Sequence, residues 1–105
     1  MSTSPPTAVH YSFRLKPGTD RETFLKASAK TGPFISQAPG FMFRRISEAE
    51  DGTWSDHVIW QSRADYDAID GSFMQDPSTG DMISLIDPAT FARTISSVLL
   101  QMQPA

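Results

Sequence analysis

The order of apolar patterns in this sequence predicts one α+β domain, in which strand, helix, strand, strand, helix and strand follow one another. Two observations carry the prediction. Residues 8–15 and 53–61 alternate apolar and polar side chains as half-buried strands do. A helix-start signal follows each of these segments, and an Asp-Gly turn signal precedes the second. A chain of 105 residues also has the size of a single domain.

The first residues suit neither a helix nor a strand ladder. Pro5 and Pro6 lack the backbone donor that both need, so we expect residues 1–7 to be a flexible arm and residues 8–105 to be the single domain. The strand expected at 8–15 has an apolar face and a polar face. The apolar face carries Val9, Tyr11, Phe13 and Leu15, and the polar face carries His10, Ser12 and Arg14.

A helix is expected after the turn at residues 16–18. Thr19 and Glu22 have the spacing of a capping box, in which the threonine starts the helix and the glutamate reaches back to it. The Gly32-Pro33 pair should kink or restart this helix, because proline removes an amide donor and crowds the preceding turn. The Pro39-Gly40 pair should end it.

A hairpin of two strands should follow, at residues 41–47 and 53–61. The Asp51-Gly52 pair gives the turn signal between them. The second of these strands has two distinct faces. One face carries Trp54, Asp56, Val58 and Trp60, and the other carries Ser55, His57, Ile59 and Gln61.

The last third of the chain predicts a helix and a closing strand. Ser62 and Asp65 form a helix cap, and apolar residues then recur at helical spacing as far as Phe73. A short helical turn is expected at 79–86. The segment 89–102 fits a helical stripe, yet its Thr, Ser and β-branched residues are weak helix formers and the sheet needs a final strand, so we expect a strand. Together these elements have the βαββαβ order of a ferredoxin-like domain.

Composition limits the classes of function. The chain has no cysteine, which excludes disulfides and thiolate chemistry. The net charge of -3 and the pI of about 5.1 argue against a nucleic-acid partner, which needs clustered lysine and arginine. No apolar run approaches the ~20 residues of a membrane span, and the start of the chain lacks the pattern of a signal peptide. We therefore expect a cytoplasmic protein without a membrane partner.

Three segments resemble the antibiotic-biosynthesis-monooxygenase-like proteins of the dimeric α/β-barrel superfamily. They are residues 13–18, 37–41 and 54–62, and the most specific is the last, with Trp54 and Trp60 on one strand before a serine cap. The resemblance covers residues 9–86, which is most of the chain. It implies a four-stranded antiparallel sheet with both helices on one face. It also implies a homodimer, in which two such sheets pack back to back into a barrel.

The resemblance further implies a cleft between sheet and helices. In enzymes of this superfamily small aromatic or polyketide substrates, or haem, occupy the cleft, and several members oxidise their substrate without a cofactor. Other members isomerise, cyclise or have no known activity, so the fold does not fix the function. The haem-degrading members use an asparagine, a tryptophan and a histidine at positions that correspond to Tyr11, Ile69 and the neighbourhood of Thr79. None matches, so we expect no haem degradation and no cofactor.

His57 and Asp56 are the candidate catalytic residues. A histidine can act as a general base near neutral pH, and parallel pairing of the first and third strands would place His57 on the face of His10. The alternative for His57 is a hydrogen-bonded histidine at a polar interface. Asp56 lies between two tryptophans on an apolar face, where a carboxylate must be paired or have its pKa raised. Its alternative role is a salt bridge, for which the candidate partners are Arg14, Arg44, Arg45 and Arg93.

The candidate substrate-binding residues are Tyr11, Trp60, Tyr66 and Arg14. Trp60 could stack on a planar substrate, and the two tyrosines could hold a substrate oxygen. Core packing is an equally good interpretation of Trp60 and the better one of Trp54. Two histidines without cysteine or paired carboxylates form a weak metal site, so no metal is expected.

Two functions of different classes stay open. The first is an oxidoreductase that resembles cofactor-independent monooxygenases and acts on an aromatic or polyketide-like substrate. The alternative is a non-catalytic domain of the same fold that binds a small molecule or assembles. An open pocket of several hundred Å³ with convergent polar groups would favour the enzyme, and a filled cleft would favour the alternative.

The second face of the predicted sheet favours a homodimer. It mixes apolar and polar side chains, too apolar to face water comfortably and too polar to be a core. Its expected members are His10, Arg14, Met42, Ile46 and Ile59.

Overall fold

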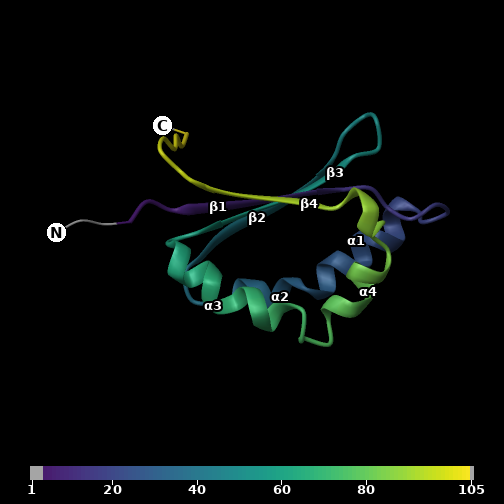
Figure 1. Ribbon diagram of the computed structural model, residues 1–105, viewed down its shortest axis with the longest axis horizontal. Helices are drawn as coiled ribbons and strands as arrows, with labels where there is room; N and C mark the ends of the chain where they lie inside the picture. Colours follow the sequence, from purple (N-terminus) through teal and green to yellow (C-terminus); the bar gives the residue numbers. More distant parts are fainter. Residues whose placement is uncertain (1–3, 105) are drawn as a thin grey trace.

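The computed structural model, which describes residues 4–104, has a four-stranded sheet with helices α1–α4 packed beneath one face (Figure 1). The first half contains β1 (Thr7–Phe13), α1 (Arg21–Lys30), α2 (Gly32–Ser36) and β2 (Phe41–Glu48). The second half contains β3 (Trp54–Trp60), α3 (Arg63–Phe73), α4 (Thr79–Ser84), the 3₁₀ turn η1 (Pro88–Thr90) and β4 (Ala92–Ser97). No helix among residues 4–104 is both long enough and apolar enough to cross a membrane.

The strand order is β2-β3-β1-β4, and every neighbouring pair is antiparallel. This order confirms the ferredoxin-like prediction, including the closing strand. The expected parallel pairing of β1 and β3 is wrong. The helical crossover keeps β2 in the direction of β1, and the hairpin then reverses β3, so β1 and β3 run in opposite directions. His10 and His57 are nevertheless register partners and share a face, as expected.

Two predicted boundaries differ from the structure. Thr7 is buried and belongs to β1 rather than to the expected arm, of which residues 1–3 lie outside the described residues. The first helix is capped by Asp20 and not by Thr19: Asp20 Oδ1 accepts from the amide of Thr23 at 2.7 Å. An ionised carboxylate accepts a stronger hydrogen bond than a hydroxyl and also complements the positive end of the helix.

Two other local predictions are confirmed. The helix is interrupted at Gly32-Pro33: α1 ends at Lys30, and α2 begins with this proline in its first turn. Ser62 caps α3 by accepting from the amide of Asp65 at 3.2 Å. These two features set the directions from which α2 and α3 approach the sheet.

A β-bulge in β2 overturns part of the predicted second face. Phe41 pairs with Trp60, whereas Phe43 already pairs with Ile59, so Met42 is an extra residue in the ladder. An extra residue reverses the alternation of faces beyond it. Ile46 therefore lies opposite Asp56 and packs among the helices, not on the open face.

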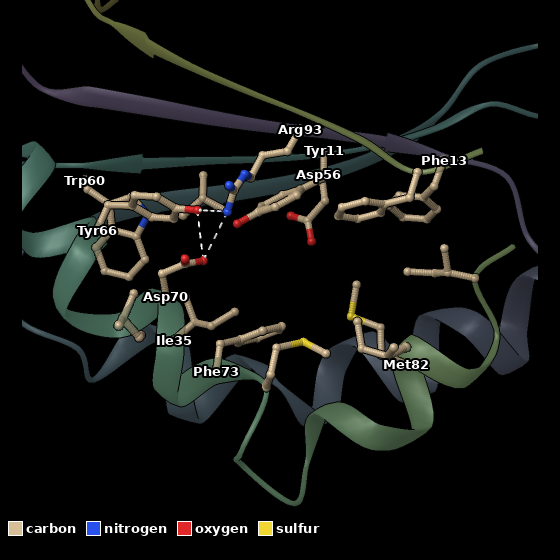
Figure 2. A pocket seen from close by; sticks show the side chains of 16 residues that line it. Tyr11, Phe13, Ile35, Asp56, Trp60, Tyr66, Asp70, Phe73, Met82 and Arg93 are labelled. Atoms are coloured by element: carbon tan, nitrogen blue, oxygen red, sulfur yellow. Dashed lines mark hydrogen bonds and ion pairs between the residues drawn. The ribbon is translucent and has the colours of Figure 1, made fainter. Parts of the chain in front are cut away.

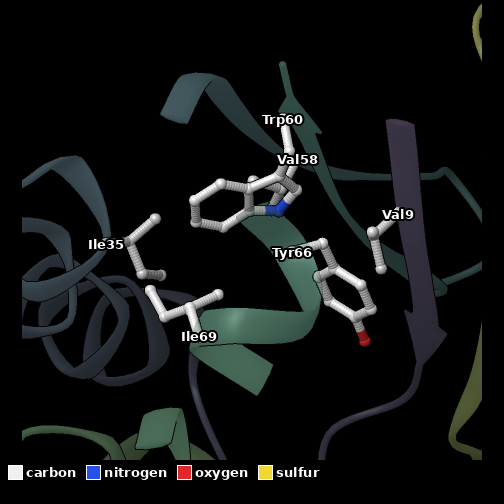
Figure 3. Close-up of a cluster of buried hydrophobic side chains, with 6 residues drawn as sticks. All are labelled: Val9, Ile35, Val58, Trp60, Tyr66 and Ile69. Carbon is white, nitrogen blue, oxygen red and sulfur yellow. The ribbon is translucent and has the colours of Figure 1, made fainter. Parts of the chain in front are cut away.

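The core lies between the sheet and the helices in two clusters. Figure 3 shows the first, which comprises Val9, Ile35, Val58, Trp60, Tyr66 and Ile69. The second comprises Phe13, Phe24, Ala27, Trp54, Met82 and Ile86. Both tryptophans of β3 face this layer, as the alternation predicts. A cavity lies where the two clusters meet.

Candidate functional site

A cavity of about 340 Å³ separates part of the sheet from the helices (Figure 2). Most of its wall is apolar or aromatic. Five tyrosine, aspartate and arginine side chains line it, namely Tyr11, Asp56, Tyr66, Asp70 and Arg93. An apolar cavity with a few convergent polar groups is the usual form of a small-molecule site.

Tyr66 is the centre of a polar cluster in this cavity, which we call the Tyr66 cluster and which comprises Tyr66, Asp70 and Arg93. The Tyr66 hydroxyl donates to Asp70 Oδ1 at 2.9 Å and accepts from Arg93 Nη1 at 2.8 Å. Arg93 Nη1 also lies 3.4 Å from Asp70 Oδ1, which closes the triangle in Figure 2. Tyr66 and Asp70 are four residues apart on α3 and therefore share a helix face. Arg93 reaches them from β4.

The electrostatics of the cavity keep both tyrosines protonated at neutral pH. Burial raises the pKa of Tyr11 well above its usual value, and the neighbouring Tyr66 and Asp70 raise it further. Burial also raises the pKa of Tyr66, and Asp70 adds to this rise. The Tyr66 hydroxyl, once it ionises at high pH, and the carboxylate of Asp70 raise the pKa of Arg93. The cavity thus presents two neutral phenols and one guanidinium cation.

Asp56 lines the same cavity but is held by Arg44. Arg44 Nε donates to Asp56 Oδ1 at 3.0 Å, and Nη2 donates to Oδ2 at 2.7 Å. The side chains of Arg44 and Asp56 are only 11% and 7% exposed. Arg44 Nη1 also donates to Thr31 Oγ1 at 2.6 Å, and the Thr31 hydroxyl donates to the carbonyl of Ser28 at 2.6 Å. This pair therefore joins β2 and β3 to the junction of α1 and α2.

Both carboxylate oxygens of Asp56 are thus occupied, as in the salt-bridge alternative. Of the four arginines that the sequence offers as partners, the structure selects Arg44. The catalytic role of Asp56 stays a prediction.

His57 and Arg14 lie away from the cavity wall. β3 turns His57 to the open face of the sheet, where its ring centroid lies 6.1 Å from that of His10 and 6.0 Å from that of Phe43. Burial lowers the pKa of His57, and the charges of His10 and Arg45 lower it further. The Arg14 guanidinium lies 3.8 Å from Asp51 at the surface. The structure does not bring either residue to the other candidates, and their functional roles stay predictions.

The other substrate-binding candidates, Tyr11, Trp60 and Tyr66, do meet in the cavity. Asp70 and Arg93 were missed as members of this site. The four-residue spacing from Tyr66 could have signalled Asp70, whereas Arg93 meets α3 only through the tertiary fold. Within residues 4–104, no three His, Asp or Glu side chains gather as metal ligands would. The wall suits an organic molecule better than an ion.

The sheet, its one-sided helices and the cavity between them define the class of protein: a ferredoxin-like α+β domain with a cavity between sheet and helices. No protein-family model matches the sequence, and no curated protein matches it. Solved structures do match, at low sequence identity.

SnoaB from Streptomyces nogalater, a cofactor-independent oxygenase, has a TM-score of 0.70 and 14% identity, over 97% of this chain and 100% of SnoaB. A protein from Bordetella bronchiseptica that is assigned by inference to the antibiotic biosynthesis monooxygenases has a TM-score of 0.74 and 13% identity, over 91% of this chain and 99% of that one. Rv0793 from Mycobacterium tuberculosis has a TM-score of 0.68 and 18% identity, over 93% and 99%. The chain has the fold of the antibiotic-biosynthesis-monooxygenase-like proteins, and the resemblance expected from the sequence is confirmed at the level of fold.

Proposed function

We propose that this protein is an enzyme that oxidises an aromatic or polyketide-like substrate with molecular oxygen and without a bound cofactor. The observation that carries the proposal is the cavity of about 340 Å³, in which phenol, carboxylate and guanidinium groups converge on an aromatic wall. The shared fold with SnoaB, a cofactor-independent oxygenase, supports the reaction class.

In such a reaction the substrate itself supplies the electrons. An activated CH₂ group of the substrate loses a proton to give an enolate, and the carbanionic carbon of this enolate reacts with O₂. A CH₂ group and O₂ then become a carbonyl and one molecule of water, which balances atoms and electrons. The protein has to bind a flat molecule, hold its oxygen and accept a proton.

The described cavity residues suit these tasks. Trp60 and Tyr11 offer aromatic surface, and the protonated phenols of Tyr11 and Tyr66 offer polar contacts to a substrate oxygen. Of the two proposed bases, Asp56 lines the cavity, although Arg44 occupies both of its oxygens. His57 could serve only a second site on the open face.

Oxygen uptake tests this proposal. With a panel of hydroquinones and anthrones, an oxygen electrode is expected to record uptake above the uncatalysed rate. Ile69→Trp, which fills part of the cavity, should abolish the excess. Arg21→Gln, which changes an exposed side chain that pairs with Glu48, should preserve it. No uptake above the uncatalysed rate with any substrate would contradict the proposal.

The second candidate function is binding of the same class of molecule without turnover. The observation that favours it is the position of the two proposed bases: Asp56 is neutralised by Arg44, and His57 lies on the other face of the sheet. Saturable binding of an anthrone without oxygen uptake would select this function.

We also propose that the open face of the sheet packs against a second copy of the chain. α1–α4 cover only the opposite face (Figure 1). The open face presents Phe43 beside His57 and His10, and Arg45 lies 5.3 Å from the Phe43 ring. Such a mixed surface is typical of an interface. Light scattering should give the mass of a dimer at micromolar concentration, and the mass of a monomer would contradict this assembly. The cytoplasmic location stays a prediction.

A further inference from the structure

Arg93 has hydrogen-bond donors to spare. Its Nη1 donates to Tyr66 at 2.8 Å and approaches Asp70 at 3.4 Å, but no group in residues 4–104 accepts from its Nε or Nη2. Its side chain is 42% exposed. Among the described residues that line the cavity, Arg93 is the one cation. A guanidinium has five N–H donors in a planar fork, which suits an anionic oxygen.

Asp70 occupies only one of the guanidinium nitrogens of Arg93. The two side chains meet through one long contact, and Asp70 Oδ1 already accepts from Tyr66. The Asp70 side chain is 47% exposed. An exposed, single-contact ion pair contributes little to stability, so a ligand can replace Asp70 at small cost. The Tyr66 hydroxyl meanwhile anchors Nη1 and keeps the guanidinium at the cavity wall.

The wall beside Arg93 is aromatic. Tyr11 is the register partner of Arg93 in the sheet. The ring of Phe91, two residues before Arg93, has its centroid 5.7 Å from that of Tyr11. Both rings line the cavity, and Phe91 is 46% exposed. A flat ligand against these two rings would lie next to the guanidinium.

We propose that Arg93 is the specificity-determining residue of this cavity and that it selects planar aromatic ligands with an ionised oxygen, either a carboxylate or a phenolate. The ligand oxygen replaces Asp70 on the guanidinium and takes up the unused Nε and Nη2 donors. Asp70 is the counter-charge of the ligand-free site and competes with the ligand. This inference rests on the proposed function in taking the cavity as the ligand site. An enolate, which cofactor-free oxidation requires, would be held by the same contact.

The test measures binding through tryptophan fluorescence, because Trp60 lines the cavity. The probes are naphthoate and naphthamide, which have nearly the same shape but differ in charge. Naphthoate is expected to bind about tenfold more tightly, as charge-assisted hydrogen bonds to a half-exposed arginine allow. Dinitronaphtholate, which is ionised at neutral pH, provides the phenolate arm and shows which anionic oxygen binds better.

Three variants test the inference: one should remove the preference for the anion, one should increase its affinity, and one is a control. Arg93→Gln should remove the preference for naphthoate over naphthamide. Asp70→Asn should increase naphthoate affinity, because the competing carboxylate is gone. Arg21→Gln changes the net charge as Arg93→Gln does, but at an exposed position outside the cavity wall, and should leave the preference unchanged. If Arg93→Gln does not fold, Arg93→Lys keeps the charge without the fork and should retain only part of the preference.

Equal binding of naphthoate and naphthamide to the wild type would overturn the inference, as would an unchanged preference in the Arg93 variant. Oxygen uptake is an independent readout. A preference for the anion without uptake supports the role of Arg93 and contradicts the proposed oxidation. Oxygen uptake without any preference for the anion would support the proposed oxidation and contradict the role of Arg93.

Discussion

Two Arg–Asp pairs lie beside one cavity, and they differ in geometry and in exposure. Arg44 meets Asp56 through two contacts of 3.0 and 2.7 Å, and the two side chains are 11% and 7% exposed. Arg93 meets Asp70 through one contact of 3.4 Å, and those side chains are 42% and 47% exposed. Each of the three guanidinium nitrogens of Arg44 donates to an oxygen of the protein, whereas Nε and Nη2 of Arg93 have no acceptor among residues 4–104.

This difference indicates which charged residues beside a cavity stabilise the fold and which can bind a ligand. A buried pair has lost its water, so each partner is needed to compensate the charge of the other. An exposed pair keeps water as an alternative partner, so its energy is small and either member can exchange partners. We therefore expect the buried pair to contribute mainly to stability and the exposed pair to be able to bind a ligand.

The largest expected effect is on Asp56. Asp56→Ala should lower the free energy of unfolding by about 3–5 kcal/mol, because it leaves Arg44 buried without a counter-charge. Asp70→Ala, the matched change in the exposed pair, should lower it by less than about 1 kcal/mol. Urea unfolding followed by circular dichroism measures both. Equal losses in the two variants would contradict the claim that the buried pair contributes more to stability than the exposed pair.

A double variant sharpens the same comparison. Arg44→Met combined with Asp56→Leu should recover most of the loss caused by Asp56→Ala, since no charge then stays buried. The coupling energy between the two positions is expected to be about 2–3 kcal/mol. Arg93 and Asp70 should couple by less than about 1 kcal/mol in the equivalent cycle. Additive losses at Arg44 and Asp56 would show that the ion pair is not the source of the stability.

A smaller effect is expected from Tyr66→Phe. The change removes the hydroxyl that joins Asp70 to Arg93, and the free energy of unfolding should fall by about 1 kcal/mol. The ring and its packing remain in this variant. A loss of stability as large as that of Asp56→Ala would show that the Tyr66 cluster, like the Arg44–Asp56 pair, is needed for the stability of the fold.

The smallest effect concerns the open face and depends on pH. Burial lowers the pKa of His57 in the folded protein. Below a pH of about 6.5 the unfolded chain therefore binds more protons at this position, and stability falls as the pH falls. His57→Gln should flatten the pH profile of urea unfolding below about pH 7, where the unfolded histidine begins to take up its proton. An unchanged slope would show that groups other than His57 control the pH dependence of stability. The carboxylates of the two Arg–Asp pairs would then be candidates.

Local patterns predicted the elements and one wall of the cavity. Alternation along β3 placed Asp56 and Trp60 on the face that the helices cover, because the faces of a strand depend only on its own sequence. The same reasoning placed Tyr11 there. The helix cap at Ser62 was also local and was predicted correctly.

The partners of the charged residues could not be predicted in this way. Whether Arg44 or Arg45 faces Asp56 depends on the bulge at Met42, and that bulge arises from pairing with β3 rather than from a local pattern. Arg93 and Tyr66 are 27 residues apart, and only the tertiary fold brings the arginine of β4 within reach of α3. The sequence therefore predicts which side chains share a surface, and the tertiary fold decides which of them bind one another.

The most direct test of the division between the two pairs is a crystal structure with a brominated naphthoate. The anomalous signal of bromine locates the ring. The account predicts bromine in the cavity, the carboxylate within hydrogen-bonding distance of Arg93, and the Arg44–Asp56 pair unchanged. Bromine outside the cavity, or a carboxylate that displaces Asp56 from Arg44, would contradict it.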